Sequence, residues 1–298
     1  MKKSVSVIVC HALALMVLFG TFMLAQAAET TTTGAVEPAT ESSTVVTDTD
    51  TKPPFKYQFK GNTEEVKGPL TFSQQFEKVF DEATPMMLEG LWVTLRVSLL
   101  AIVFGLFIGL ATCFMGRSKH FIFRAISATY VWVIRGTPMI VQAFLVFFAI
   151  PGLIQMWSPE FRIDPIEAGL ITLSLNAGAY MSEIFRGGIA AVPKGQTEAA
   201  RSLGLSSFRT MIKIVLPQAF KMSIPSLVNQ FIITIKDSSI LSVIGLTEIV
   251  NLAKVYVGST YLFFPTYIMV AIYYLVIISA LMIVSKLLEK KLNYDKKS

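Results

Sequence analysis

Long apolar stretches alternate with shorter polar and basic segments along most of the chain. The stretches long enough to cross a bilayer lie near residues 97–115, 139–157, 166–185, 223–245 and 264–285. A helix needs about 20 mostly apolar residues to cross about 30 Å of hydrocarbon. The pattern therefore predicts an all-α, polytopic membrane protein with five transmembrane helices, within a domain of residues 85–298.

The composition agrees with a membrane protein. Apolar residues make up 53% of the chain and charged residues only 15%. This balance excludes an ordinary soluble globule. The two cysteines, Cys10 and Cys113, lie in apolar runs, and the two histidines have no neighbouring ligand residues. We therefore expect neither a disulfide framework nor a metal site, and we expect a bilayer rather than a nucleic acid as the partner of the basic residues.

The N-terminal part of the chain reads differently. Lys2 and Lys3 precede an apolar run, and Ala25-Gln26-Ala27 fits the cleavage pattern of a secretory signal. Residues 1–27 are interpreted as a signal peptide, with a retained signal anchor as the alternative. Residues 28–84 are expected to form an extracytoplasmic tether, disordered at first and then amphipathic, because Phe72, Phe76 and Phe80 share one helical face.

The distribution of lysine and arginine predicts the orientation in the membrane. Fifteen of them lie after the expected spans 97–115, 166–185 and 264–285, whereas the opposite loops hold only Arg162 and Lys254. Basic residues accumulate on the cytoplasmic side. The loop at about residues 186–222 and the C-terminus are therefore predicted to be cytoplasmic, and the N-terminal tail is predicted to be outside.

The cytoplasmic loop carries the most specific pattern. Pro193 and Gly195 are expected to stop one helix, Thr197 to cap a short new one, and Gly204 to end it after about two turns. Ser206 or Ser207 then starts another helix, which Pro217 is expected to end. The small side chains of Ala199 and Ala200 would let a partner approach the short helix closely. An ordinary helical hairpin between two spans is the alternative.

This loop resembles the EAA loop of the membrane subunits of ATP-binding-cassette importers. The matching positions are Glu198, Ala199, Ala200, Gly204, Ile214, Leu216 and Pro217. Four further segments resemble the polar amino acid permease family, which serves histidine, glutamine, arginine and related substrates: Arg135-Gly136-Thr137-Pro138, residues 176–189, Leu216-Pro217-Gln218-Ala219 and Lys236-Asp237-Ser238-Ser239. Ile240 departs from the leucine usual in the family.

The resemblance implies a transport subunit and not an enzyme. It implies that the EAA residues couple the chain to a cytoplasmic ATPase dimer, that an external amino-acid-binding protein delivers substrate, and that the permease pairs with itself or with a paralogue. The chain has no G-x-x-x-x-G-K-[ST] phosphate loop. ATP and Mg are therefore expected on the ATPase partner, with no cofactor bound by this chain.

Several polar residues inside apolar stretches are candidates for the substrate path or a gate: Lys236, Asp237, Ser238, Ser239, Asn176 and Gln142. Each lone charge in a span costs about 2.5 to 3.5 kcal/mol on insertion scales, so such charges need partners. The alternative for Lys236 and Asp237 is a structural lock with neighbouring helices. A single polar residue such as Asn176 more often forms an interhelical hydrogen bond than a substrate contact.

Three other features concern structure. Glu183 and Arg186 are three residues apart and are expected to form an ion pair, as a structural hinge beside the loop. Arg135 is interpreted as an interfacial anchor, and Gly105 with Gly109 as a small pair for helix packing. Two other classes remain open: an ion-gradient-driven secondary amino acid transporter, and a membrane scaffold or signalling subunit.

Overall fold

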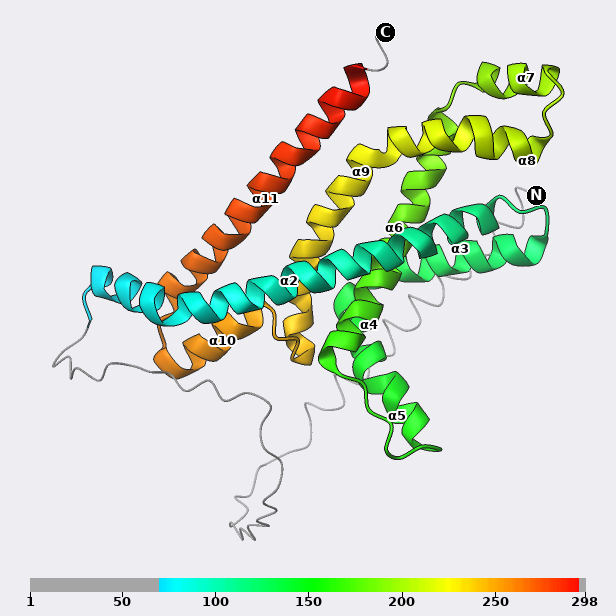
Figure 1. Ribbon diagram of the computed structural model, residues 1–298. Helices are drawn as coiled ribbons and strands as arrows, with labels where there is room; N and C mark the ends of the chain where they lie inside the picture. Colours follow the sequence, from blue (N-terminus) through cyan, green and yellow to red (C-terminus); the bar gives the residue numbers. More distant parts are fainter. Residues whose placement is uncertain (1–69, 295–298) are drawn as a thin grey trace, which may run out of the picture. The chain divides into compact units, whose positions relative to one another are not determined.

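The computed structural model describes residues 70–294, so the expected signal segment and most of the expected tether lie outside the described residues. Every regular element within 70–294 is helical (Figure 1), which agrees with the predicted all-α class. The elements are α2 (Phe72–Gly116), α3 (Phe121–Gly136), α4 (Met139–Phe144), η1 (Leu145–Ala149), α5 (Ile150–Gln155), α6 (Pro165–Ala191), α7 (Lys194–Ser202), α8 (Ser207–Thr210), η2 (Met211–Val215), α9 (Leu216–Asp237), η3 (Ser238–Ile244), α10 (Ile249–Thr260) and α11 (Phe263–Tyr294).

Helix α2 begins well before the first expected span. Thr71 forms a capping box with Gln74, which satisfies backbone donors at the helix start. The helix continues for 45 residues through Pro85, crossing the expected boundary between residues 84 and 85. At 1.5 Å per residue it is about 67 Å long, more than twice the thickness of the hydrocarbon core. The expected amphipathic segment is thus the first part of the same helix.

The second expected span, residues 139–157, forms only one half of a bent pair of helices. Helix α3 and the segment α4–η1–α5 pass the length and hydropathy test only together, and they meet at an angle of 107°. Pro138 disfavours helical geometry at Thr137. The side-chain amide of Gln142 donates to the carbonyl oxygens of Ile134 at 2.7 Å and Thr137 at 3.0 Å. Gln142 therefore satisfies backbone acceptors that the bend leaves open.

Helix α6 packs so closely on α2 that the two backbones approach each other without large side chains between them. A Cβ added to Gly105 would come within 2.9 Å of the Ala177 Cβ, and one added to Gly109 within 2.7 Å of the Met181 Cβ. The interpretation of Gly105 and Gly109 as a helix-packing pair is confirmed. Close approach lets two helices gain dispersion contacts along their length without large side chains between them.

Three helices are long and apolar enough to cross a membrane: α2, the continuous helix over residues 207–244, and residues 263–288 of α11. The bent pair raises the number to four. Helix α6 has 27 residues, but its buried positions are mainly small or polar, because it packs on protein instead of lipid. Five membrane spans are therefore not confirmed by composition alone within residues 70–294.

The prediction that Pro217 ends a helix is wrong. Helices α8, η2 and α9 are contiguous, and Pro217 lies in the first turn of α9 directly after the π-helical turn η2. Proline removes one backbone donor and crowds the preceding turn. A wider π turn provides space at such a position. The helix that starts after Ser206 consequently runs on to Ile244, where Gly245 ends it with φ of 83°.

Exposed apolar side chains cover the outer helices. Leu275, Val276 and Ile283 on α11 are each at least 60% exposed, as is Phe107 on α2. Apolar surfaces of this extent are unusual on soluble monomers and are typical of membrane or subunit contacts. The described helices are therefore those of an integral membrane protein.

Packing of α6 on α9 can be tested at two adjacent glycines. A Cβ on Gly188 would lie 2.8 Å from the carbonyl oxygen of Ala219, whereas a Cβ on Gly187 meets nothing within 4 Å. We expect Gly188→Ala to lower the free energy of unfolding by about 1–3 kcal/mol, because the helices must separate. Thermal unfolding in detergent measures this effect, with Gly187→Ala as the matched control. Equal melting temperatures for the two variants would contradict this packing.

Candidate functional site

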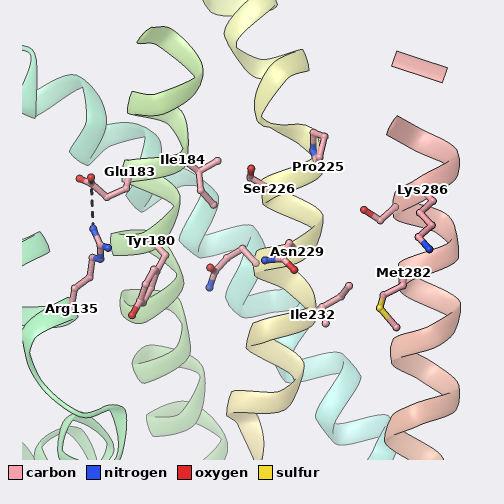
Figure 2. Close-up of a pocket in the computed structure, with 12 residues that line it drawn as sticks. Arg135, Tyr180, Glu183, Ile184, Pro225, Ser226, Asn229, Ile232, Met282 and Lys286 are labelled. Atoms are coloured by element: carbon pink, nitrogen blue, oxygen red, sulfur yellow. Dashed lines mark ion pairs between the residues drawn. The ribbon is translucent and has the colours of Figure 1, made fainter. Parts of the chain in front are cut away.

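A cavity of about 760 Å³ lies among helices α3, α6, α9 and α11 (Figure 2). Charged and polar groups from all four helices line it, beside apolar ones. The lining residues are Arg135, Tyr180, Glu183, Ile184, Pro225, Ser226, Asn229, Gln230, Ile232, Met282, Ser285 and Lys286. Its size is in the range of small-molecule sites, which combine apolar walls with a few polar groups.

One wall of the cavity is an ion-pair cluster centred on Glu183. Its carboxylate lies 3.7 Å from the Arg135 guanidinium and also pairs with Arg186. The Arg135 guanidinium stands 5.1 Å from the centre of the Tyr180 ring, a cation–π distance. The predicted pair of Glu183 with Arg186 is confirmed, while its role as a hinge stays a prediction.

Arg135 has a contact that its position before Thr137-Pro138 did not suggest, while its role as an interfacial anchor stays a prediction. It is the last basic residue of α3 and reaches across to α6, where it pairs with Glu183. Figure 2 shows this contact as a dashed line, with Tyr180 next to it. The pairing joins two helices whose contacting residues are 48 positions apart, so no local sequence pattern indicates it.

The opposite wall consists mainly of α9. Pro225, Ser226 and Asn229 project from one side of this helix, and Gln230 lies next to them with 3% of its surface exposed. Lys286 of α11 faces the cavity from the far side in Figure 2. The cavity thus offers charges of both signs together with amide and hydroxyl groups. Such a set can bind a zwitterion that carries a polar side chain.

The six residues predicted for the path or gate lie elsewhere, and none of them is among those lining this cavity. The side chain of Gln142 is hydrogen-bonded to the backbone at the bend after α3. Asn176 is buried on α6. Ser238 and Ser239 bond to the carbonyl oxygens of Ile235 and Lys236, at the junction where α9 gives way to the 3-10 helix η3. Contact of these six residues with substrate stays a prediction.

The short loop helix is present as α7, but its start differs from the prediction. It begins at Lys194 with Pro193 in the N-cap position, so Gly195 lies inside the helix and Thr197 is not a cap. Proline fits helix starts because a missing N–H costs nothing there. Within the EAA pattern the two alanines separate, since Ala200 is buried and Ala199 is exposed together with Glu198. Ile214 lies in η2, just before Leu216 and Pro217 open α9.

Gly204 ends α7 as expected. Its φ is 80°, and its N–H donates to the Arg201 carbonyl at 3.0 Å, while the N–H of Leu205 donates to the Ala200 carbonyl at 3.1 Å. These two bonds form a Schellman motif, for which glycine is the favoured residue. Ser206 then caps α8 by accepting from the N–H of Arg209 at 3.3 Å. Of the two serines proposed to restart the helix, Ser206 is the cap.

No group of three or more metal-binding side chains occurs within residues 70–294. The site therefore consists of charged, amide, hydroxyl and aromatic groups among apolar helices. These features define a membrane protein with a polar cavity between its helices, the class to which transport proteins belong. Comparison with known proteins identifies the family.

The chain matches the family described as "Binding-protein-dependent transport system inner membrane component" over residues 101–294. It belongs to that family. It is 37% identical over 179 residues to the glutamine transport system permease protein GlnP of Escherichia coli (strain K12), covering 60% of this chain and 80% of that one. It is 39% identical over 170 residues to the L-cystine transport system permease protein TcyB of Bacillus subtilis (strain 168), covering 57% and 70%.

Solved structures agree. A chain from the crystal structure of an amino acid ABC transporter with histidines is 35% identical, with a TM-score of 0.67, and the match covers 75% of this chain and all of that one. The methionine ABC transporter MetNI, in an inward-facing conformation, shares the fold at 16% identity and a TM-score of 0.58. The predicted family is confirmed. The chain is a permease subunit of an ABC importer for amino acids.

The Glu183 cluster can be tested as a unit. We expect Glu183→Gln and Arg135→Gln each to lower the melting temperature, because each removes the ion pair between α3 and α6. The double variant should lose less free energy of unfolding than the two single variants lose together. The difference should be about 1 kcal/mol, as for a partly exposed ion pair. Thermal unfolding of the four proteins in detergent measures this coupling. Strict additivity would show that the pair does not join α3 to α6.

Proposed function

We propose that this permease carries polar amino acids along a path that includes the cavity between α3, α6, α9 and α11. The observation that supports the proposal most strongly is the presence of Arg135 and Glu183 on one wall, 3.7 Å apart, opposite the polar side of α9. A free amino acid has a carboxylate and an ammonium group within a few ångströms of each other. The cavity offers a partner of the right charge for each.

Substrate binding would exchange partners and leave no charge unpaired. The carboxylate of the amino acid would accept bonds from Arg135, and its ammonium group would donate to Glu183. One ion pair within the protein is replaced by two charge-assisted contacts with the substrate. An apolar molecule has no charged groups to replace the ion pair that is lost when Arg135 separates from Glu183. The arrangement therefore favours zwitterions.

The polar side of α9 would select the substrate side chain. Ser226, Asn229 and Gln230 supply hydroxyl and amide groups that donate and accept. Such groups match amide, hydroxyl or imidazole side chains better than aliphatic ones, since an unpaired buried polar group costs about 1–3 kcal/mol. The relative with the name glutamine permease, at 37% identity, supports a polar substrate.

We propose that α7 receives force from a separate cytoplasmic ATPase dimer, which binds the ATP and Mg. Glu198, Ala199, Ala200 and Gly204 form this helix and its end, while Ile214, Leu216 and Pro217 form the next helix below it. The exposed Ala199 adds little bulk to the surface of α7. An ATPase cleft that closes on this surface would move α6 and α9 and open the cavity alternately to each side.

The complete importer has further partners in this proposal. An external amino-acid-binding protein delivers substrate, and a second permease subunit, either another copy or a paralogue, completes the path. The N-terminal tail lies outside and the C-terminus inside a multi-pass bacterial cell membrane, with α6 as one of five spans. Lys236, Asp237, Ser238 and Ser239 form a gate at the change from α9 to η3, with Asn176 and Gln142 on the neighbouring helices.

Uptake into vesicles tests the substrate and the energy source together. The permease is reconstituted with its ATPase, and its binding protein is supplied on the outer side. We expect ATP inside the vesicles to drive uptake of labelled glutamine or histidine, with leucine competing at least tenfold more weakly. Vesicles carrying an ion gradient without ATP are the control. Uptake in that control would favour a secondary transporter over the importer.

The end of α7 allows a sharper test of coupling. Valine at Gly204 must adopt φ of 80°, which is strained for a β-branched residue, whereas asparagine tolerates this conformation. We expect Gly204→Val to reduce uptake at least tenfold while ATP hydrolysis continues, because α7 loses its fixed position. Gly204→Asn is the matched control and should retain most uptake. Normal transport by the valine variant would contradict the proposed role of α7.

A further inference from the structure

A second cavity, of about 410 Å³, lies where α3 crosses the end of α2 and the C-terminal half of α6. It is distinct in composition from the cavity described above, because two thirds of its lining residues belong to α3. Its lining residues are Gly116, Arg124, Ser127, Ala128, Val131, Trp132, Arg135, Glu183 and Arg186. We call it the α3 cavity.

Positive charge dominates the α3 cavity. Three arginines, Arg124, Arg135 and Arg186, line it together with a single carboxylate, that of Glu183. Glu183 is already shared by Arg135 and Arg186, so one carboxylate faces three guanidinium groups. The lining carries a net charge of about +2. Guanidinium groups bind phosphate oxygens with two parallel hydrogen bonds, which makes a phosphodiester a fitting counter-charge.

The position of the α3 cavity indicates a membrane boundary. Gly116, in its lining, is the last residue of α2 and directly follows the apolar stretch 97–115, which is long enough to cross the bilayer. Trp132, also in the lining, is 76% exposed, and tryptophan concentrates where hydrocarbon meets headgroups. Beside the cavity, α3 exposes Phe121 and Ile122 by 74% and 69%. A charged recess and an apolar surface therefore adjoin each other.

We propose that the α3 cavity binds the phosphodiester headgroup of an anionic phospholipid, whose acyl chains lie along the exposed apolar side of α3. The arginines would neutralise the phosphate, and Ala128 and Val131 would contact the glycerol backbone. Basic recesses between membrane helices are suited to such lipids. A free phosphate ion shares the headgroup chemistry but makes no use of the apolar surface.

The proposal places the lipid directly behind the Glu183 cluster. Arg135 and Glu183 line both cavities, so their ion pair separates the amino acid path from the headgroup. Arg124 lines the α3 cavity and is not among the residues that line the first cavity. Its replacement therefore tests lipid binding without altering a residue of the proposed path, and failure of the lipid site leaves the proposed transport function untouched.

Lipid binding can be measured on the full-length permease in detergent by native mass spectrometry. The probes are phosphatidylglycerol, phosphatidylcholine and inorganic phosphate. We expect phosphatidylglycerol to bind more tightly than phosphatidylcholine, whose choline cation opposes the arginines. Arg124→Gln should weaken phosphatidylglycerol binding about fivefold, the effect of removing one basic residue near the headgroup. Arg124→Lys, which keeps the charge, should weaken binding less.

Lys119→Gln is the matched control, because Lys119 is an exposed basic residue between α2 and α3 that does not line the α3 cavity. Its phosphatidylglycerol affinity should equal that of the unaltered protein. Equal losses in Arg124→Gln and Lys119→Gln would show only diffuse attraction and would overturn the proposed site. Displacement of phosphatidylglycerol by an equal concentration of inorganic phosphate would overturn the lipid assignment, because the apolar side of α3 would then contribute nothing.

Discussion

The close packing of α6 on α2 is the constraint on which the other features depend. Glycine at positions 105 and 109 lets the two backbones approach until added Cβ atoms would collide with Ala177 and Met181. This contact fixes the height and rotation of α6. Helix α6 in turn carries Tyr180 and Glu183 to the cavity wall and leads into α7. A small error in this packing would therefore misplace both the proposed path and the coupling helix.

Polar groups lie near a break in the helices, beside this closely packed centre. The bend between α3 and α4 brings Arg135 to Glu183, and Gln142 satisfies the carbonyl oxygens that the bend exposes. Backbone that is not helical at membrane depth is tolerated where protein groups satisfy it. Charged groups are placed in the same way, since Glu183 serves two arginines. Arg135 and Glu183 thus have partners before substrate arrives, which lowers the cost of placing these two charges at the cavity.

The sequence was most informative where the physics is local. The Schellman end at Gly204, the cap at Ser206, the glycine pair of α2 and the pair Glu183–Arg186 all follow from residues a few positions apart. The prediction that Pro217 ends a helix failed because a propensity pattern does not reveal a π turn. Helix α6 is less apolar than an expected span because protein surrounds it. The contact of Arg135 with Glu183 depends on tertiary structure alone. Two adjacent amides, Asn229 and Gln230, in an apolar helix were a signal for the cavity that could have been used.

The link between α6 and α7 has a mechanical consequence. Only Val192 and Pro193 separate the two helices; Val192 is 7% exposed, packed in a cluster with Ile189 and Val215, and proline has a fixed φ. A connector with so few accessible conformations is a stiff link between the two helices. Under the proposed coupling, a displacement of α7 would therefore be transmitted through α6 to the Glu183 region, and the two helices would move together.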